Sequence, residues 1–158
     1  KADKRCTPAA TRARYLRTMN RFLLFSSLVI ALLSVSCKKE STTGVPPVQL
    51  DVSININLPE YADLQVVGGW VYLTGGSQGL IVYRKNQDEF SALDRHCPFQ
   101  PENLCHVIVD ESGVIARDTA CCHSAYLIMD GQPTEGPSSF PLKAYHTTFN
   151  GTMLRIYN

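Results

Sequence analysis

The side chains best able to carry out chemistry are cysteines and histidines on or beside two short segments, residues 95–105 and 119–126, about twenty residues apart. They are Cys97, Cys105, Cys121, Cys122, His96, His106 and His123. Thiolate sulfur and imidazole nitrogen are the ligands of zinc and iron–sulfur sites, and thiols pair as disulfides in oxidising compartments. The spacing predicts that a strand pair brings two loops together to form a metal, redox or disulfide site.

Short β-rich runs separated by turn residues must position these loops. In residues 48–56 apolar side chains occupy every second position, which is the period of a half-buried strand. Further runs are 64–73, 80–84, 106–109 and 153–157, and turn signals stand at 75–76, 110–113, 130–131 and 150–151. Asn150-Gly151 predicts a type I′ hairpin that pairs 143–149 with 152–157. No amphipathic helix is expected after Cys37, so the pattern indicates an all-β sandwich or small barrel.

The N-terminal third has the composition of a targeting segment. Residues 1–18 carry six basic side chains and one acid, and we expect them not to belong to the working protein. From Met19 a positive segment leads into fourteen almost wholly apolar residues, 22–35, fewer than the roughly 20 that span a bilayer. We therefore expect a signal peptide over 19–36.

Small residues precede Cys37 and resemble the lipobox of bacterial lipoproteins. The resemblance implies that Cys37 becomes the acylated N-terminus, followed by a flexible tether, 37–47. An ordinary cleaved signal peptide with a chance cysteine is the alternative. We expect a protein anchored by lipid in the cell envelope, facing the periplasm or the cell surface.

The charge distribution excludes one class of partner. From Lys38 onward the chain carries a net charge of −5, with no basic stripe, so we expect no nucleic acid to bind. The sequence also lacks a Ser/His/Asp arrangement, a phosphate loop or a carboxylate pair that would indicate an enzyme.

Several motifs resemble the Rieske domain family. Residues 136–145, Gly-Pro-Ser-Ser-Phe-Pro-Leu-Lys-Ala-Tyr, are similar to the Gly-Pro-x-x-x-Pro-Leu-x-x-Tyr segment after the second cluster loop of that family. Residues 121–126 resemble the second loop itself, 94–98 stand at the first loop, and 149–156 resemble the closing hairpin. The resemblance covers roughly 48–158 and implies an antiparallel β sandwich with two cysteine-bearing loops at one end.

The ligand set that the resemblance implies is incomplete. A Rieske [2Fe-2S] cluster takes two cysteines on one iron and two histidines on the other. Cys97 fills the first cysteine position, but Phe99 replaces its histidine. In the second loop, either His123 is the ligand and Ala120 replaces the cysteine, or Tyr126 matches the family's aromatic residue and Cys122 and Thr119 replace histidine and cysteine. The remnant metal positions are Cys97, Cys122 and His123.

We expect no cofactor, with [2Fe-2S] or zinc as alternatives, the latter held by Cys97, Cys105, Cys122 and His123. Some Rieske domains carry a disulfide between the two loops, which implies that Cys105 pairs with Cys121 or Cys122, and we expect the Cys105–Cys122 pair. Adjacent residues of a strand point to opposite faces, so Cys121 and Cys122 should not both face the first loop. The expected protein is a non-enzymatic lipoprotein in a binding or structural role, with an envelope protein as partner. The alternative is an electron carrier with altered cluster ligands.

Overall fold

The computed structural model describes residues 44–158. The predicted upstream segment 1–18, the signal peptide 19–36 and the acylated Cys37 lie outside the described residues, as does most of the tether. Within 44–158, no helix combines the length and the apolar character needed to cross a membrane.

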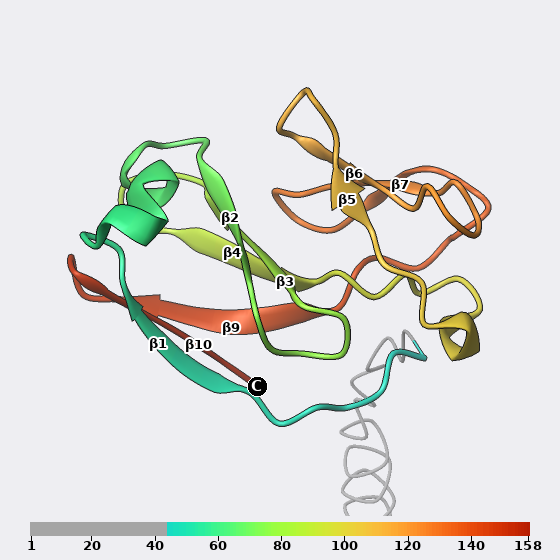
Figure 1. The fold of residues 1–158 in the computed structure, drawn as a ribbon, viewed down its shortest axis with the longest axis horizontal. Helices are drawn as coiled ribbons and strands as arrows, with labels where there is room; N and C mark the ends of the chain where they lie inside the picture. Colours follow the sequence, from blue (N-terminus) through green and yellow to red (C-terminus); the bar gives the residue numbers. More distant parts are fainter. Residues whose placement is uncertain (1–43) are drawn as a thin grey trace, which may run out of the picture. The chain divides into compact units, whose positions relative to one another are not determined.

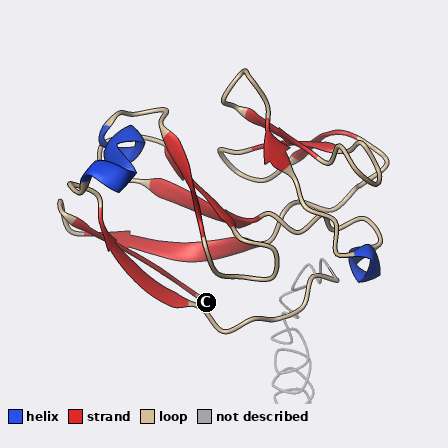
Figure 2. Cartoon of the chain, viewed as in Figure 1, coloured by secondary structure: helices blue, strands red, loops and turns tan. Residues whose placement is uncertain are grey.

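The described domain is built on antiparallel strands joined by loops and turns, and its helices are two short 3-10 segments, as Figure 2 shows. One sheet has six strands in the order β1-β10-β9-β4-β3-β2, and the other has four in the order β5-β6-β7-β8 (Figure 1). The elements are β1 (Asp51–Asn55), η1 (Pro59–Gln65), β2 (Trp70–Leu73), β3 (Leu80–Arg84), β4 (Phe90–Asp94), η2 (Pro101–Asn103), β5 (Ile108–Val109), β6 (Ile115–Arg117), β7 (Ala125–Leu127), β8 (Pro133–Glu135), β9 (Ala144–Phe149) and β10 (Met153–Tyr157). The all-β class, the antiparallel sheets and the clustering of cysteines expected of a Rieske-like domain are confirmed.

The six-stranded sheet curls around its own apolar core. Ile54 of β1 and Leu154 of β10 pack in the same buried cluster as Leu80 and Val82 of β3, and Val71 of the opposite edge strand β2 packs against it. A flat sheet could not bring its two edge strands into one cluster. Apolar burial of this kind stabilises by about 25 cal/mol for each Å² removed from water.

A second apolar core joins the four-stranded sheet to β3 and β4. Ile81 and Leu93 contribute from β3 and β4, while Ala116 and Tyr126 contribute from β6 and β7. Cys97 and Cys105 are members of this cluster. The loops that carry the cysteines are therefore built onto a packed core.

Most predicted strands are present, but the run 64–73 is only half right. Strands β1, β3 and β10 fall inside the predicted runs, whereas Leu64 belongs to the 3-10 segment η1 and strand β2 begins only at Trp70. The side chain of Leu64 is buried in the first core from η1, which accounts for an apolar residue at this position without a strand. A turn at Gly68 and Gly69 separates the two elements, and a Cβ at Gly69 would lie 1.7 Å from the Asp63 carbonyl oxygen.

The closing hairpin pairs β9 with β10 as predicted, but its turn is not type I′. That turn needs positive φ at both central residues, and of this turn's residues only Gly151, with φ of 92°, has one. The side chain of Asn150 instead accepts hydrogen bonds from the amides of Thr152 and Met153.

Candidate functional site: two loops joined at four cysteines

The first loop leaves the end of β4 and is closed by backbone hydrogen bonds at its base. The Cys97 amide donates to the Cys105 carbonyl over 2.9 Å, and the Val107 amide donates to the Arg95 carbonyl over 2.7 Å. The segment η2 forms the tip of this loop. His96 is buried, and its ring nitrogens lie 2.8 Å from Ser77 Oγ and 2.8 Å from the Pro101 carbonyl oxygen. These contacts give His96 a structural role.

A buried carboxylate, Asp94, anchors the start of this loop. It accepts hydrogen bonds from the backbone amides of Ser77, Gln78 and His96 and from the hydroxyl of Tyr145. Burial and the hydrogen bond to the Asp94 carboxylate both raise the pKa of the Tyr145 phenol. Asp94 therefore ties together the β2–β3 turn, the first loop and β9.

The second loop connects β6 to β7 and is organised by Asp118, whose side chain is fully buried. Its Oδ1 accepts the amides of Ala120 and Cys121, at 3.0 and 2.9 Å, and its Oδ2 accepts the Cys122 amide at 3.3 Å. Burial raises the pKa of the Asp118 carboxyl, but hydrogen bonds from the Cys121 amide and the Cys122 thiol outweigh that effect, so the pKa lies below its ordinary value. The loop thus closes around a carboxylate.

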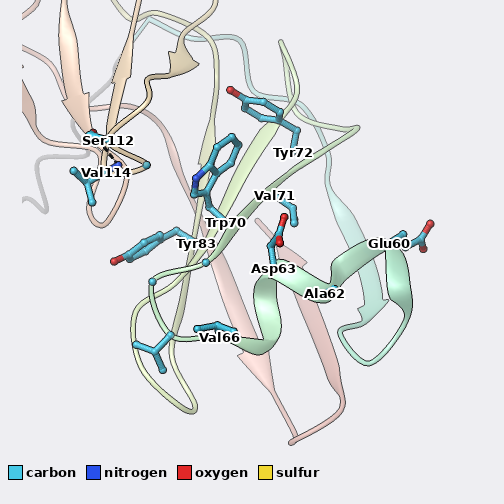
Figure 3. Close-up of a pocket in the computed structure, with 14 residues that line it drawn as sticks. Glu60, Ala62, Asp63, Val66, Trp70, Val71, Tyr72, Tyr83, Ser112 and Val114 are labelled. Atoms are coloured by element: carbon cyan, nitrogen blue, oxygen red, sulfur yellow. Dashed lines mark hydrogen bonds between the residues drawn. The ribbon is translucent and has the colours of Figure 1, made fainter.

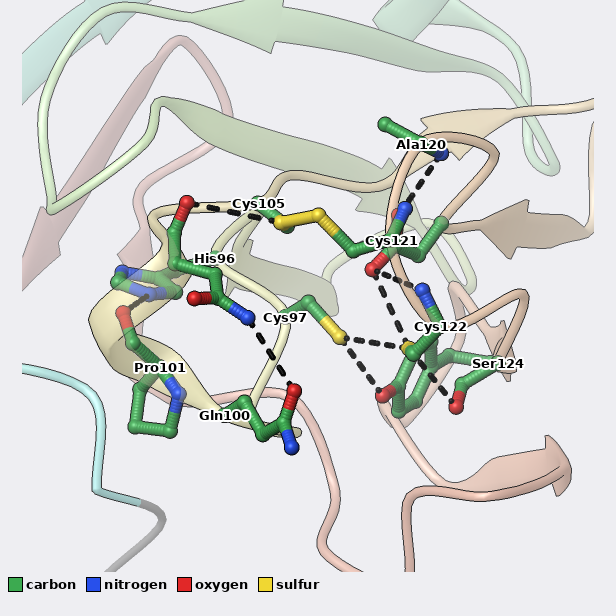
Figure 4. The surroundings of a disulfide bond; sticks show 12 residues. His96, Cys97, Gln100, Pro101, Cys105, Ala120, Cys121, Cys122 and Ser124 are labelled. Atoms are coloured by element: carbon green, nitrogen blue, oxygen red, sulfur yellow. Dashed lines mark hydrogen bonds between the residues drawn. A yellow bond between two sulfur atoms is a disulfide. The ribbon is translucent and has the colours of Figure 1, made fainter.

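Two pairs of cysteine sulfurs join the loops, as Figure 4 shows. Cys105 and Cys121 form a disulfide, while Cys97 and Cys122 are free thiols whose sulfurs lie 3.3 Å apart. Cys97 is fully buried, and burial raises the pKa of its thiol to about 12, although the Tyr126 hydroxyl 3.5 Å away lowers it. Cys122 is only partly buried.

The disulfide differs from the expected pair, because Cys105 bonds to Cys121 rather than to Cys122. The expectation that adjacent cysteines could not both face the first loop is also wrong. Residues 119–122 form a turn and not a strand, so the two-residue alternation of a strand does not apply. Cys121 reaches Cys105, and Cys122 reaches Cys97.

The structure brings two of the three remnant metal positions together. Cys97 and Cys122 meet, but His123 is exposed at a positive φ of 59° and belongs to neither group of potential ligands in the described residues. Asp118 stands in its place, with donor atoms of Cys97, Asp118 and Cys122 all within 4.8 Å of one another. Sequence reasoning missed Asp118. The one available signal was an Asp at the start of a turn, where its side chain commonly accepts the backbone amide two residues on.

The donor set does not fit a [2Fe-2S] cluster. Phe99 packs against the second core, and Thr119 is exposed, so neither aligned position supplies an ordinary iron ligand. The disulfide at Cys121 and the proximity of Tyr126 to Cys97 favour the register in which Cys122 replaces the ligand histidine. In that register Cys97 and Cys122 would bind different irons, yet their sulfurs are 3.3 Å apart. This spacing suits one ion or a thiol pair.

A groove of about 860 Å³ lies elsewhere on the domain, between η1, β2, β3 and the β5–β6 turn (Figure 3). Trp70 and Tyr83 line it together with the acidic residues Glu60 and Asp63. Tyr72 lines its edge, and its hydroxyl accepts the Val109 amide over 2.9 Å. The groove combines aromatic faces with negative charge.

The described domain is thus a two-sheet antiparallel β protein with a disulfide and a thiol pair across two loops. No family model matches the chain, and no curated protein matches it. Among solved structures, it is similar to a chain of the complex of reduced oxygenase and oxidized ferredoxin in carbazole 1,9a-dioxygenase, at 18% identity and a TM-score of 0.47, covering 69% of this chain and 94% of that one.

Two further solved structures are similar. One is the ferredoxin of carbazole 1,9a-dioxygenase from Nocardioides aromaticivorans IC177, at 14% identity and a TM-score of 0.46, covering 70% of this chain and 98% of that one. The other is described as an NADH-dependent nitrite reductase small subunit from Mycobacterium tuberculosis. It has 16% identity and a TM-score of 0.42, and the match covers 71% of this chain and 97% of that one. In each case the alignment spans nearly the whole of the other chain.

Proposed function

We propose that this chain is a lipid-anchored protein of the bacterial cell envelope whose Rieske-like domain works without a [2Fe-2S] cluster, in a binding or structural role. The observation that supports this most is the donor set at the two loops. Two thiols in contact and one carboxylate stand where the family has two cysteines and two histidines. The anchor is supported by the lipobox-like residues before Cys37.

The disulfide and the aromatic groove support the binding or structural role. The Cys105–Cys121 bridge holds the two loops in place without a metal cluster. The groove between η1 and the β5–β6 turn offers Trp70 and Tyr83 as faces for a partner, with Glu60 and Asp63 to attract positive charge. The proposed partner is an envelope protein.

Metal content and visible absorption of the full chain test the proposal. We expect a colourless protein without stoichiometric iron and sulfide, whereas the alternative, an electron carrier with altered ligands, predicts a coloured protein that contains both. Iron and sulfide at two atoms each per chain would overturn the proposal.

A variant that restores the family's ligands sharpens this test. The triple substitution Phe99→His, Thr119→Cys and Cys122→His supplies two cysteines and two histidines and leaves the Cys105–Cys121 disulfide intact. We expect this variant to become coloured on iron–sulfur reconstitution, with Phe99→His alone as the colourless control. A folded triple variant that takes up no iron would contradict the assigned register.

Fractionation tests the anchor separately. The wild-type chain should partition with membranes and begin at an acylated Cys37, because several acyl chains bind a bilayer firmly. Cys37→Ala should be soluble or remain unprocessed. A soluble wild-type form with another N-terminus would contradict the lipoprotein assignment.

A further inference from the structure

We propose that Cys97, Cys122 and Asp118 together bind a single zinc ion, with a water molecule as fourth ligand. The inference deepens the proposed function and rests on it, since the site is free for another ion only if it holds no cluster. The two sulfurs and the carboxylate come from both loops and lie within 4.8 Å of one another. Thiolate and carboxylate are both established zinc ligands.

The distances are close to those of a tetrahedral zinc site. Two thiolates at the usual zinc–sulfur length of about 2.3 Å would lie about 3.8 Å apart in tetrahedral geometry. The observed separation of the Cys97 and Cys122 sulfurs is 3.3 Å. A sulfur and a carboxylate oxygen on the same zinc would lie about 3.6 Å apart, and the Cys122 sulfur lies 3.2 Å from Asp118 Oδ2. For these two pairs an ion would need to spread the donors by only about half an ångström, and the third pair, Cys97 and Asp118, lies within 4.8 Å.

The same distances argue against a linear two-thiolate ion such as Cu(I). With a metal–sulfur bond of similar length, linear coordination would place the two sulfurs about 4.6 Å apart. The loops would then have to open by more than an ångström, against the adjacent Cys105–Cys121 bridge. The bridge also removes the second group, Cys105, Asp118 and Cys121, as a metal site, because a disulfide has no thiolate to offer.

Hydrogen bonds already orient the carboxylate for this role. Asp118 Oδ1 accepts the amides of Ala120 and Cys121, while Oδ2 accepts the amide and the thiol of Cys122. When the thiols lose their protons to solvent, the lone pair of Oδ2 that accepted the Cys122 thiol can coordinate the ion, while the Cys122 amide still holds Oδ2 in place. Two protons leave for each zinc bound.

Two hydroxyl groups lie close enough to the sulfurs to donate hydrogen bonds to the thiolates. Ser124 Oγ lies 3.1 Å from the Cys122 sulfur and accepts the Ser138 amide over 2.9 Å, which fixes its position. The Tyr126 hydroxyl lies 3.5 Å from the Cys97 sulfur. Each can donate a hydrogen bond to a bound thiolate, as outer partners of metal ligands commonly do. The partial exposure of Cys122 gives the ion access from solvent.

Zinc binding to the full chain, purified anaerobically without thiol reductants, tests the proposal. We expect one zinc per chain in competition with a chromophoric chelator, and thiolate-to-metal absorption after replacement by Co²⁺. Cys122→Ser and Asp118→Asn should each weaken zinc binding by more than 100-fold, because even outer partners contribute 10–100-fold. His123→Ala is the matched control from the same loop and should bind zinc as the wild type does.

Several outcomes would overturn the zinc site. They are a stoichiometry near zero, wild-type affinity in Cys122→Ser, loss of zinc in His123→Ala, or a Cys97–Cys122 disulfide found by mass spectrometry in the anaerobic protein. Asp118 also organises its loop, so Cys122→Ser carries the test if Asp118→Asn does not fold. A colourless protein that binds no zinc would refute this site and leave the proposed function standing, whereas stoichiometric iron and sulfide would refute both.

Discussion

Removing the disulfide between the two loops should destabilise the domain by about 3 kcal/mol. The perturbation is the double variant Cys105→Ala and Cys121→Ala. The bridge joins residues 16 apart in sequence. The entropy that a cross-link removes from an unfolded chain over a loop of this length corresponds to about 3 kcal/mol at 25 °C.

Urea unfolding followed by circular dichroism measures this effect. With a slope of about 1–3 kcal/mol per molar urea, the midpoint should fall by roughly 1–3 M. A reductant should lower the wild-type midpoint similarly and leave the double variant unchanged, which separates the cross-link from the packing of the buried Cys105 side chain. A midpoint that is the same in wild type and variant, or a mass map that shows a Cys105–Cys122 bridge, would refute the reasoning.

Three further predictions concern buried groups near the loops. Asp94→Ala should cost more than about 3 kcal/mol in urea unfolding, because it leaves several inward-facing donors without their acceptor. Because the pKa of Tyr145 is raised in the folded state, its protonated phenol contributes a stabilisation that is complete below pH 10 and is lost as the pH rises above it. The free energy of unfolding should therefore fall in alkali, and fall less steeply in Tyr145→Phe, as unfolding at pH 8–12 would show. In the metal-free folded protein at pH 8, iodoacetamide should modify Cys122 and spare Cys97, whose thiol is buried with a pKa of about 12; equal labelling of both would contradict this.

Sequence alone identified the elements whose pattern is local. Alternating residues predict β1, and short β-rich runs bounded by turn residues predict β3 and β10, because one residue's neighbours along the chain decide which face it presents. Strand β4 was not predicted from the sequence, because all five of its residues are buried and its apolar and polar residues therefore do not alternate. The run 64–73 was misread because Leu64 is buried by a 3-10 segment, whereas the residues of β2 lie partly buried or exposed in an edge strand.

For the site, the sequence determined which cysteines and other candidate residues are present, and the tertiary structure decided which of them contact one another. Residue types and spacing placed four cysteines on two loops and showed that Phe99 breaks the family's ligand pattern. Only the folded chain could pair Cys105 with Cys121, place the Cys122 sulfur against Cys97, and exclude His123 from the group. It also brought Asp118 beside the thiols. Such choices depend on the direction of a side chain within a turn, and contacts distant in sequence set that direction.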